Sequence, residues 1–239
     1  MDILHQPERV IIEYNGMWLV SNFEKMQLPK GWGVEQQITC VDGSTFQMYM
    51  ANMKSIFMDM IKNTDMVIFN RCKKEDPLPT YRRGIKVANQ RAEVIFEDEE
   101  GELGDIFQDE MPFDMDAPVI EILPEDYGIW FVDAMDHPEN YDGKTVKFKA
   151  RVMKPRGMGS KFFVPGRTAM TCCADDTTFL GYVCKSAYAP KLTAGQWVEV
   201  TAKVGIEKRN EYQGEEGIVL DAEYVEPCEP LADEMVYFN

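Results

Sequence analysis

The stretch Lys144-Thr-Val-Lys-Phe-Lys-Ala-Arg-Val152 decides the expected fold of this chain. Its apolar side chains stand at every second position from Val146 to Val152, and Lys147, Lys149 and Arg151 fill the positions between them. Because successive side chains of a strand point to opposite faces, this alternation predicts a strand with one buried and one solvated face. The solvated face of this strand is basic.

Further strand patterns follow on the C-terminal side. We expect four more strands, at residues 167–173, 178–184, 197–204 and 216–225. A short helix is expected at residues 186–192, and an earlier one opens at Pro124 and must end before Pro138. Five strands within about 100 residues are typical of a small Greek-key barrel of the oligonucleotide/oligosaccharide-binding (OB) type. We therefore predict an OB-like β-barrel over residues 119–230, with residues 231–239 as a tail.

The N-terminal part, residues 1–96, mixes helical and strand patterns. Asn15-Gly16 and Asp42-Gly43-Ser44 each separate two apolar runs, which predicts two hairpins, over residues 10–20 and 34–50. Apolar residues recur at helical spacing over residues 50–63. Residues 66–70, 85–87 and 92–96 are further strand candidates. The sequence therefore predicts a mainly β, α+β protein in which a small α+β domain of unknown role precedes the barrel.

Charge is unevenly distributed along the chain. The 41 acidic and 25 basic residues give a net charge of −16. Residues 97–116 contain ten acids and no base, whereas residues 142–210 contain thirteen bases and five acids. Together with its glycines and prolines, the acidic run predicts a connector over residues 97–118. This connector can lie in solvent or dock on the basic barrel face, and the sequence leaves both open.

The composition, 45% hydrophobic and 28% charged, is that of an ordinary globular protein. No apolar run approaches the roughly 20 residues of a membrane span, so we expect no membrane insertion. The first residues have neither the basic start nor the apolar region of a signal peptide. We therefore expect a cytoplasmic protein with reduced cysteines.

Sequence signatures of enzymes are missing. The chain has no P-loop, and Gly157-Met-Gly159 does not continue into a dinucleotide fingerprint. Histidine occurs twice, at His5 and His137, and neither has a patterned nucleophile or acid beside it. We expect no catalytic activity.

Cysteines provide the clearest candidate for a metal site. Cys172 and Cys173 precede an expected turn that contains Asp175 and Asp176, and Cys184 follows on the next expected strand. If the strand bends at the turn, thiolates and carboxylates could approach the tetrahedral coordination that zinc prefers. Core packing is the alternative and the commoner interpretation, because free cysteine is among the most buried residue types.

The basic strand face suggests a second kind of ligand. Lys147, Lys149 and Arg151, with Arg156, Lys161 and Arg167 nearby, would suit a groove for single-stranded nucleic acid. Such a groove also needs stacking aromatics, for which Phe162, Phe163 and Tyr182 are candidates. The acidic net charge makes nucleic acid a less favoured partner without excluding it.

The run Gly166-Arg-Thr-Ala-Met-Thr-Cys-Cys-Ala-Asp175, followed by Gly181-Tyr182 and Gln196-Trp-Val-Glu-Val-Thr201, resembles the soluble C-terminal domain of the YcgQ family. The resemblance covers about residues 125–239. It implies a non-catalytic accessory protein, the partner of a predicted membrane permease, in a setting of metal-ion homeostasis for which zinc is the candidate ion. The site residues it implies are Arg167, Thr171, Cys172, Cys173, Asp176 and Gly181.

Two features depart from that family. Its members usually begin with membrane spans, which this sequence lacks, and the usual second Ala-Asp unit of the motif is here Ala174-Asp175-Asp176. The N-terminal half has no counterpart in the resemblance. We therefore expect a binding or accessory protein that associates with a membrane complex through its partner. Single-stranded nucleic-acid binding and a ligand-free protein-interaction module are the alternatives.

Overall fold

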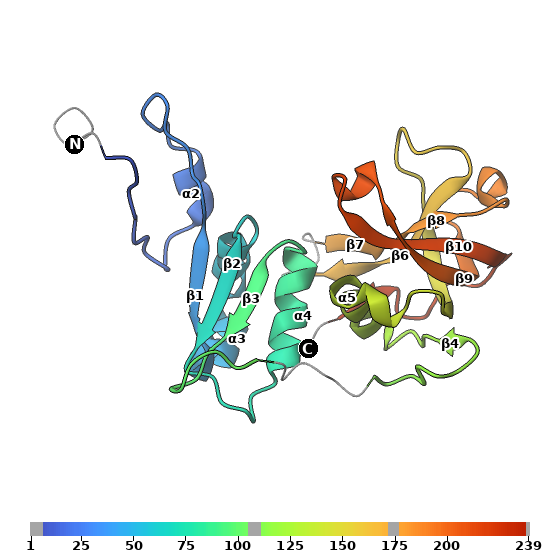
Figure 1. Ribbon diagram of the computed structural model, residues 1–239, viewed down its shortest axis with the longest axis horizontal. Helices are drawn as coiled ribbons and strands as arrows, with labels where there is room; N and C mark the ends of the chain where they lie inside the picture. The colour runs from blue at the N-terminus through green and yellow to red at the C-terminus, as the bar shows by residue number, and fades with distance from the viewer. Residues whose placement is uncertain (1–6, 105–110, 172–176, 238–239) are drawn as a thin grey trace.

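Two packed units follow one another in the computed structural model, which describes residues 7–104, 111–171 and 177–237 (Figure 1). The first unit is a small three-stranded sheet with helices, and the second is a β-barrel with a helix packed against it. Within the described residues, no helix has the length and apolar character needed to cross a bilayer.

The barrel is closed by a ring of strand pairings. Its strands are β5 (Thr145–Met153), β6 (Phe162–Met170), β7 (Thr177–Gly181), β8 (Val183–Lys185), β9 (Trp197–Lys208) and β10 (Glu216–Pro227). Strand β5 pairs antiparallel with both β6 and β9, β9 pairs with β10, and β10 runs parallel to β8, which returns to β6. Strands β7 and β8, separated by Tyr182 alone, act as one strand. Five strands therefore close an OB-like barrel, which confirms the predicted fold class.

Alternation along β5 and β9 decides which side chains fill this barrel. Val146, Phe148, Ala150 and Val152 are buried, and the intervening basic residues point outward, as the sequence predicts. Strand β6 begins at Phe162, earlier than expected. The sequence does not reveal this start, because Phe163 to Arg167 are all buried and therefore show no alternation of apolar and polar residues. The helix expected at residues 186–192 is reduced to the 3-10 turn η3 (Ala189–Lys191), which contains Pro190.

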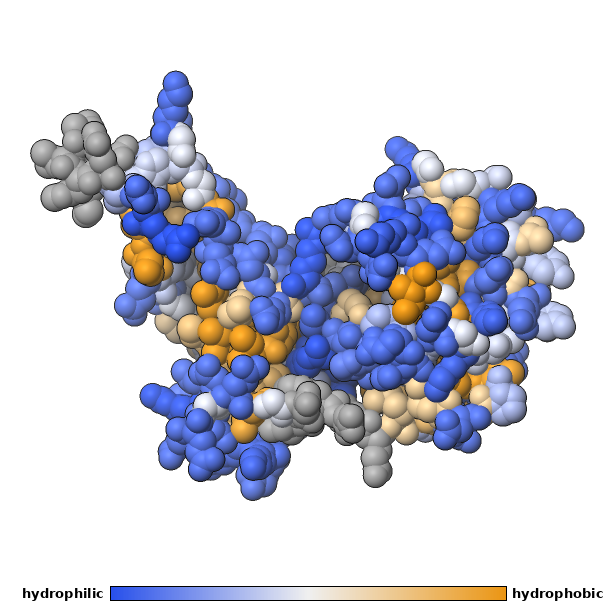
Figure 2. Space-filling model, in the orientation of Figure 1, coloured by the Kyte–Doolittle hydropathy of each residue, from blue (hydrophilic) through white to orange (hydrophobic). Residues whose placement is uncertain are grey.

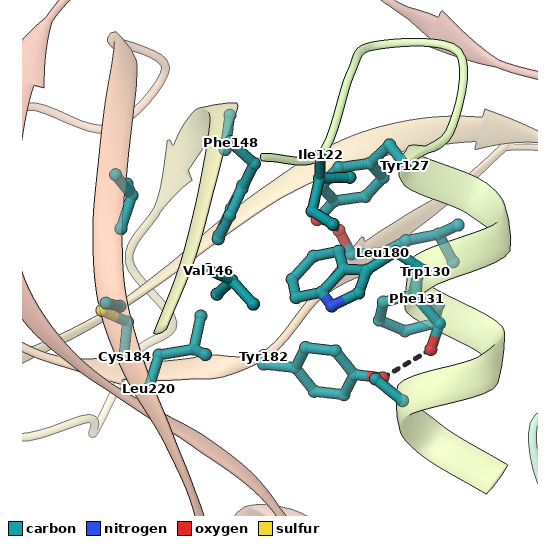
Figure 3. Close-up of a cluster of buried hydrophobic side chains, with 14 of the residues drawn as sticks. Ile122, Tyr127, Trp130, Phe131, Val146, Phe148, Leu180, Tyr182, Cys184 and Leu220 are labelled. Carbon is teal, nitrogen blue, oxygen red and sulfur yellow. Dashed lines mark hydrogen bonds between the residues drawn. The ribbon is translucent and has the colours of Figure 1, made fainter. Parts of the chain in front are cut away.

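One helix, α5 (Tyr127–Asp136), completes the barrel core (Figure 3). The Trp130 ring lies 4.8 Å from that of Phe148 and 5.7 Å from that of Tyr182, measured between centroids. The Tyr182 hydroxyl donates a hydrogen bond of 2.5 Å to the carbonyl of Phe131. Because Tyr127 and Trp130 are 1% exposed, the helix brings large aromatic side chains into the barrel.

Short elements extend the barrel sheet. Strand β4 (Ile120–Glu121) runs parallel to β5, and β11 (Met235–Val236) runs parallel to β6. The remaining 3-10 turns are η2 (Pro138–Asn140) and η4 (Asn210–Tyr212).

The N-terminal unit is a parallel β-α-β-α-β arrangement. Its elements are α2 (Val20–Glu24), β1 (Ile38–Asp42), η1 (Gly43–Thr45), α3 (Phe46–Ile61), β2 (Met66–Asn70), α4 (Leu78–Ala88) and β3 (Glu93–Phe96). The strand order is β1-β2-β3. Val67, Phe69 and Phe96 share one core with the buried residues of α3 and α4, so both helices cover the same face of the sheet.

Both predicted hairpins in this unit are wrong. No strand forms over residues 10–20, and the segment after Asp42-Gly43-Ser44 enters α3 instead of returning as a strand. The Asp42 carboxylate accepts a hydrogen bond from the Ser44 N–H at 3.0 Å, which starts this helical turn. The strand expected at residues 85–87 is also wrong, because Ile85 and Val87 lie on the buried side of α4. A run of three residues cannot distinguish the two kinds of element.

An ion pair joins the two units. Arg82 and Lys86 of α4 both face Asp136 at the end of α5; Arg82 contacts its carboxylate directly, and the Lys86 Nζ lies 3.5 Å from it. The Asp136 side chain is 7% exposed, so this pair is shielded from solvent more than an ordinary surface pair. Helix α4 also packs beside α5 and β7 (Figure 1).

We expect Gly166→Ala to destabilise the barrel. A Cβ at this position would overlap the carbonyl oxygen of Leu180 and the ring of Phe179 on the paired strand β7. Such overpacking costs about 1–3 kcal/mol, measurable as a lower midpoint in urea unfolding. Gly84→Ala in α4 is the matched control, because a Cβ added there would have no other atom within 4 Å. That change should raise stability by about 0.5–1 kcal/mol, and equal midpoints for the two variants would contradict the close approach of β6 and β7.

Candidate functional site

Two loops at one end of the barrel enclose an open cleft of about 580 Å³. One loop, residues 154–161, joins β5 to β6, and the other, residues 209–215, joins β9 to β10. In barrels of this type the corresponding loops bind oligonucleotides and oligosaccharides. The cleft is lined by Pro155, Arg156, Gly157, Met158, Lys208, Arg209, Asn210 and Glu211.

Loop 154–161 is anchored at both ends. The Lys154 Nζ donates hydrogen bonds to the carbonyls of Ala189, at 2.8 Å, and Leu192, at 2.5 Å. At the other end, the Phe162 N–H bonds the Gly159 carbonyl at 2.9 Å. Gly157 has a φ of +84°, which L side chains rarely adopt, so glycine permits the turn between the anchors. Arg156 lies exposed on this turn.

Loop 209–215 is held by Tyr212. The Tyr212 hydroxyl accepts a hydrogen bond from the Val183 N–H at 3.2 Å and donates one to the Ile218 carbonyl at 2.5 Å. Its ring covers Gly217, where a Cβ would lie 2.5 Å from the ring. The loop is therefore fixed to two strands of the barrel, and its cleft-lining residues lie on a positioned backbone.

Arg209 stacks on an aromatic ring beside the cleft. Its guanidinium carbon lies 4.4 Å from the centroid of the Phe162 ring. Glu211 accepts two hydrogen bonds from the same guanidinium, at 2.9 and 3.2 Å. These bonds raise the pKa of Arg209 and lower that of the Glu211 carboxyl. Arg209 thus offers a fixed planar group, 16% exposed, whose charge is balanced by its neighbour.

The excess positive charge of the cleft comes from Arg156 and Lys208. Both side chains are exposed, and neither forms an ion pair with another residue in the described part of the chain. From the sequence, Arg156 is expected near a nucleic-acid groove, whereas Lys208 is not. The sequence offers one indication of this cleft. Two consecutive bases, Lys208 and Arg209, stand where β9 passes into the loop before the last barrel strand.

The basic face of β5 lies apart from this cleft and carries its own counterions. The Lys147 Nζ lies 3.1 Å from Glu199 and 3.9 Å from Glu121, and the hydrogen bond with Glu199 raises the pKa of Lys147. Lys149 is directly opposite Glu199 in the strand register, and Arg151 donates a hydrogen bond to the Gly195 carbonyl at 3.3 Å. Of its three bases, Lys147 is therefore ion-paired with acids of the barrel, and Arg151 is held by a backbone carbonyl.

The three aromatic residues expected to stack on nucleic acid lie in different places. Phe163 and Tyr182 are buried in the barrel core, at 0% and 5% exposure. Phe162 is half-buried beneath Arg209 at the cleft. Of these three aromatics, Phe162 alone adjoins a cluster of basic residues on the surface.

Arg167 is a buried clamp on the chain termini of the barrel. Its guanidinium donates hydrogen bonds to the carbonyls of Pro124 at 2.5 Å, Asp233 at 3.1 Å and Met235 at 3.1 Å. The side chain also lies 5.6 Å from the Tyr127 ring centroid, and burial lowers the pKa of Arg167. The clamp joins the approach to α5 and the tail strand β11 to β6.

Thr171 and Gly181 occupy packing positions. Thr171 is 7% exposed at the end of β6. Gly181 faces Gly166 on the paired strand, and a Cβ on it would lie 2.6 Å from the Pro165 carbonyl oxygen. Their roles in a binding site remain predictions.

The proposed metal ligands are not brought together by the described structure. Cys172, Cys173, Asp175 and Asp176 lie outside the described residues. Cys184 is fully buried with Val146 and Leu220 in the barrel core (Figure 3), and burial raises the pKa of its thiol. Cys184 is paired with Phe163 of β6. Phe163 stands seven residues before the last residue of β6, Met170, which is about 23 Å along an extended strand. Among the described residues no cluster of three His, Cys, Asp or Glu side chains could hold a metal ion.

We expect Arg167→Ala to loosen the C-terminal tail. The change leaves three carbonyls without their donor and should cost about 2–4 kcal/mol of unfolding free energy. Hydrogen exchange at Met235 and Val236 would rise with it. Arg151→Ala is the matched control, since that side chain is exposed, and should stay within about 0.5 kcal/mol. Unchanged exchange in the tail of the Arg167 variant would contradict the clamp.

Comparison with known proteins finds matches to the C-terminal part of the chain. Two crystal structures of Rim1, a mitochondrial single-stranded DNA-binding protein from S. cerevisiae, align with 37% of this chain and 97% of theirs. Identity is 11% and the TM-score 0.23, a likeness too low to carry an argument. None of the curated proteins matches the sequence. The model of the DUF1980 C-terminal domain matches residues 103–238, more than half of the chain, and the protein therefore belongs to the DUF1980 family.

Proposed function

We propose that this protein is a non-catalytic binding protein whose barrel takes an anionic ligand with a planar base in the cleft between loops 154–161 and 209–215. A nucleotide and a short single strand of nucleic acid share this chemistry. The observation that carries the proposal is the placement of exposed Arg156 and Lys208 around the Arg209–Phe162 stack.

Charge supports an anion in this cleft although the chain as a whole is acidic. At physiological ionic strength, charges farther apart than about 8 Å are largely screened from one another. An anion in the cleft therefore responds mainly to its immediate lining, where Arg156 and Lys208 are exposed. Glu211 is engaged by Arg209 at 2.9 Å, which reduces its repulsion of the ligand.

The fixed guanidinium of Arg209 supports a ligand with a planar nucleobase, which could stack on it. Nucleobases stack on aromatic rings and on arginine planes, with about 1–3 kcal/mol per base for aromatic stacking. Since Glu211 and Phe162 fix the guanidinium, little side-chain entropy remains to be lost on stacking. The bases of the cleft, Arg156, Lys208 and Arg209, are few, so we expect a short ligand.

We expect weak, salt-dependent binding of short oligonucleotides. Fluorescence anisotropy with labelled 12-nucleotide DNA and RNA at low salt should give saturable binding that weakens with a log–log slope of about −0.7 for each phosphate contact. Arg156→Ala/Lys208→Ala should weaken affinity by about tenfold, because two charge-assisted contacts are lost. Competition by AMP tests whether a single nucleotide is enough to occupy the cleft. Competition by inorganic phosphate tests whether the phosphate group binds without the nucleobase.

The control for charge is Lys203→Ala, which removes an exposed base five residues from Lys208, about 17 Å along β9. Its affinity should stay unchanged. Arg209→Lys keeps the charge without the planar group and should weaken oligonucleotides more than inorganic phosphate. Absence of binding by oligonucleotides and AMP at low salt would refute the proposal, as would equal losses in the Lys203 and Arg156/Lys208 variants.

A metal-linked accessory role is a second candidate. Its support is the sequence Cys172-Cys173-Ala-Asp175-Asp176 between β6 and β7, together with the resemblance to the YcgQ family. In this role the protein would bind zinc and act beside a membrane permease. The site would draw on these four side chains, and buried Cys184 would belong to the core.

We expect about one zinc per chain in protein purified without chelator or a metal-affinity tag, measured by elemental analysis. Cys172→Ser/Cys173→Ser should lose the zinc while remaining folded. Cys228→Ser, a half-buried thiol elsewhere in the chain, should retain it. A metal-free protein whose Cys172 and Cys173 react only after denaturant is added would identify them as core residues and end this candidate role.

A further inference from the structure

In the described part of the chain, one face of the N-terminal sheet has no helix over it. The helices α3 and α4 bury Val67, Phe69 and Phe96, so the alternate residues of the strands point to the other side. Parallel sheets normally have both faces covered. Hydrophobic side chains gather over β1, β2 and β3 in Figure 2. The apolar part of this open face is formed by Ile38, Cys40, Met66, Ile68 and Ile95, and Asp42, Asn70 and Glu93 lie at its margins.

The strand register makes the open face continuous. Cys40 pairs with Ile68, which pairs with Ile95, giving one row across all three strands. Ile38 pairs with Met66 in the next row. Ile38 is 48% exposed and Cys40 is exposed, so the side of the face nearest the edge strand β1 is the most open to solvent.

The same chain has a second uncovered apolar surface, the N-terminal arm of residues 7–36. Its hydrogen bonds to α3, from Ser21 to Asp59 and from Tyr49 to Gly16, tie it to the helical side of the sheet. Its large apolar side chains nevertheless remain 41–91% exposed: Val10, Ile11, Ile12, Met17, Trp18, Leu19, Met26 and Val34. Monomeric proteins rarely leave so many together in solvent.

We propose that two copies of this chain form a symmetric dimer in which the arm of each copy lies on the open face of the other. A two-fold arrangement covers both apolar surfaces at once, because each chain supplies an arm and receives one. Gly31 and Gly33 lie between the apolar part of the arm and β1, and Gly31 already has a φ of +89°. They give the backbone freedom to redirect the arm.

The available area is sufficient for a stable pair. Taking about 150 Å² for a fully exposed large side chain, the eight arm residues present on the order of 700 Å² of surface. Two arms therefore present on the order of 1,400 Å², within the range of about 1,200–2,000 Å² of a standard protein interface. A second copy supplies this complement without any other partner.

Charge permits association of two copies through this unit. Residues 1–96 contain 12 bases and 11 acids, a net charge of +1, whereas the rest of the chain carries −17. Like-charge repulsion between two N-terminal units is therefore small, and the acidic part of each chain is screened beyond a Debye length of about 8 Å.

Sedimentation equilibrium of the full chain tests the dimer. At about 50 μM, above a micromolar dissociation constant, we expect the mass of two chains. Ile11→Lys on the arm and Ile38→Lys on the open face should each raise the dissociation constant at least tenfold. Ile11 is 91% and Ile38 48% exposed, so neither change removes a core residue. Met48→Lys is the control, because Met48 is 66% exposed on α3, and should leave the dimer unchanged.

Alkylation of Cys40 reports on the same face. In the dimer Cys40 should react at least tenfold more slowly than in the Ile38→Lys monomer, as followed by mass spectrometry of its peptide. A wild-type monomer at this concentration overturns the proposal, whether Cys40 is free or is covered by its own arm. A dimer that survives either Ile11→Lys or Ile38→Lys also overturns it, because its interface lies elsewhere.

Discussion

A sheet must bury its apolar face, and the two sheets of this protein meet that requirement to different extents. The barrel curls on itself and receives the aromatic side chains of α5, so Trp130, Phe148 and Tyr182 pack together with little exposure. Closure also removes free strand edges. Among the described residues, the N-terminal sheet has helices on one side alone. The barrel is therefore complete within one chain, whereas the N-terminal unit leaves apolar surface for another molecule.

The closed barrel also determines what its surface can bind. Where strands lie side by side, Lys147 of β5 forms an ion pair with Glu199 of the neighbouring strand β9. Loops leave the sheet and have fewer such neighbours. Arg156, on loop 154–161, and Lys208, the last residue of β9, stay exposed beside the cleft, while Tyr212 and Lys154 hold the loop backbones. Loops held on a rigid scaffold are a common place for binding residues.

Buried and half-buried cations connect the elements around the barrel. Arg167 joins the start of α5 and the tail to β6 through three carbonyls. Arg82 and Lys86 join the N-terminal helix α4 to Asp136 at the other end of α5. Helix α5 is thus held at both ends while its middle fills the core. A change in the position of α5 would therefore alter its contacts with both the tail and the N-terminal unit.

The sequence by itself determined the barrel strands with strict alternation, the end of α5 before Pro138 and the mixed character of the N-terminal unit, because these depend on local periodicity and on proline. It did not determine pairing partners. Residues 10–20 and 34–50 have good hairpin turns, yet β1 pairs with distant β2, since burial against α3 and α4 outweighs local turn preference. Tertiary structure alone decided that Arg167 is a clamp, that Cys184 is a core thiol and that Arg156 meets Lys208. Those outcomes depend on which segments lie side by side across the closed sheet, which no local pattern records.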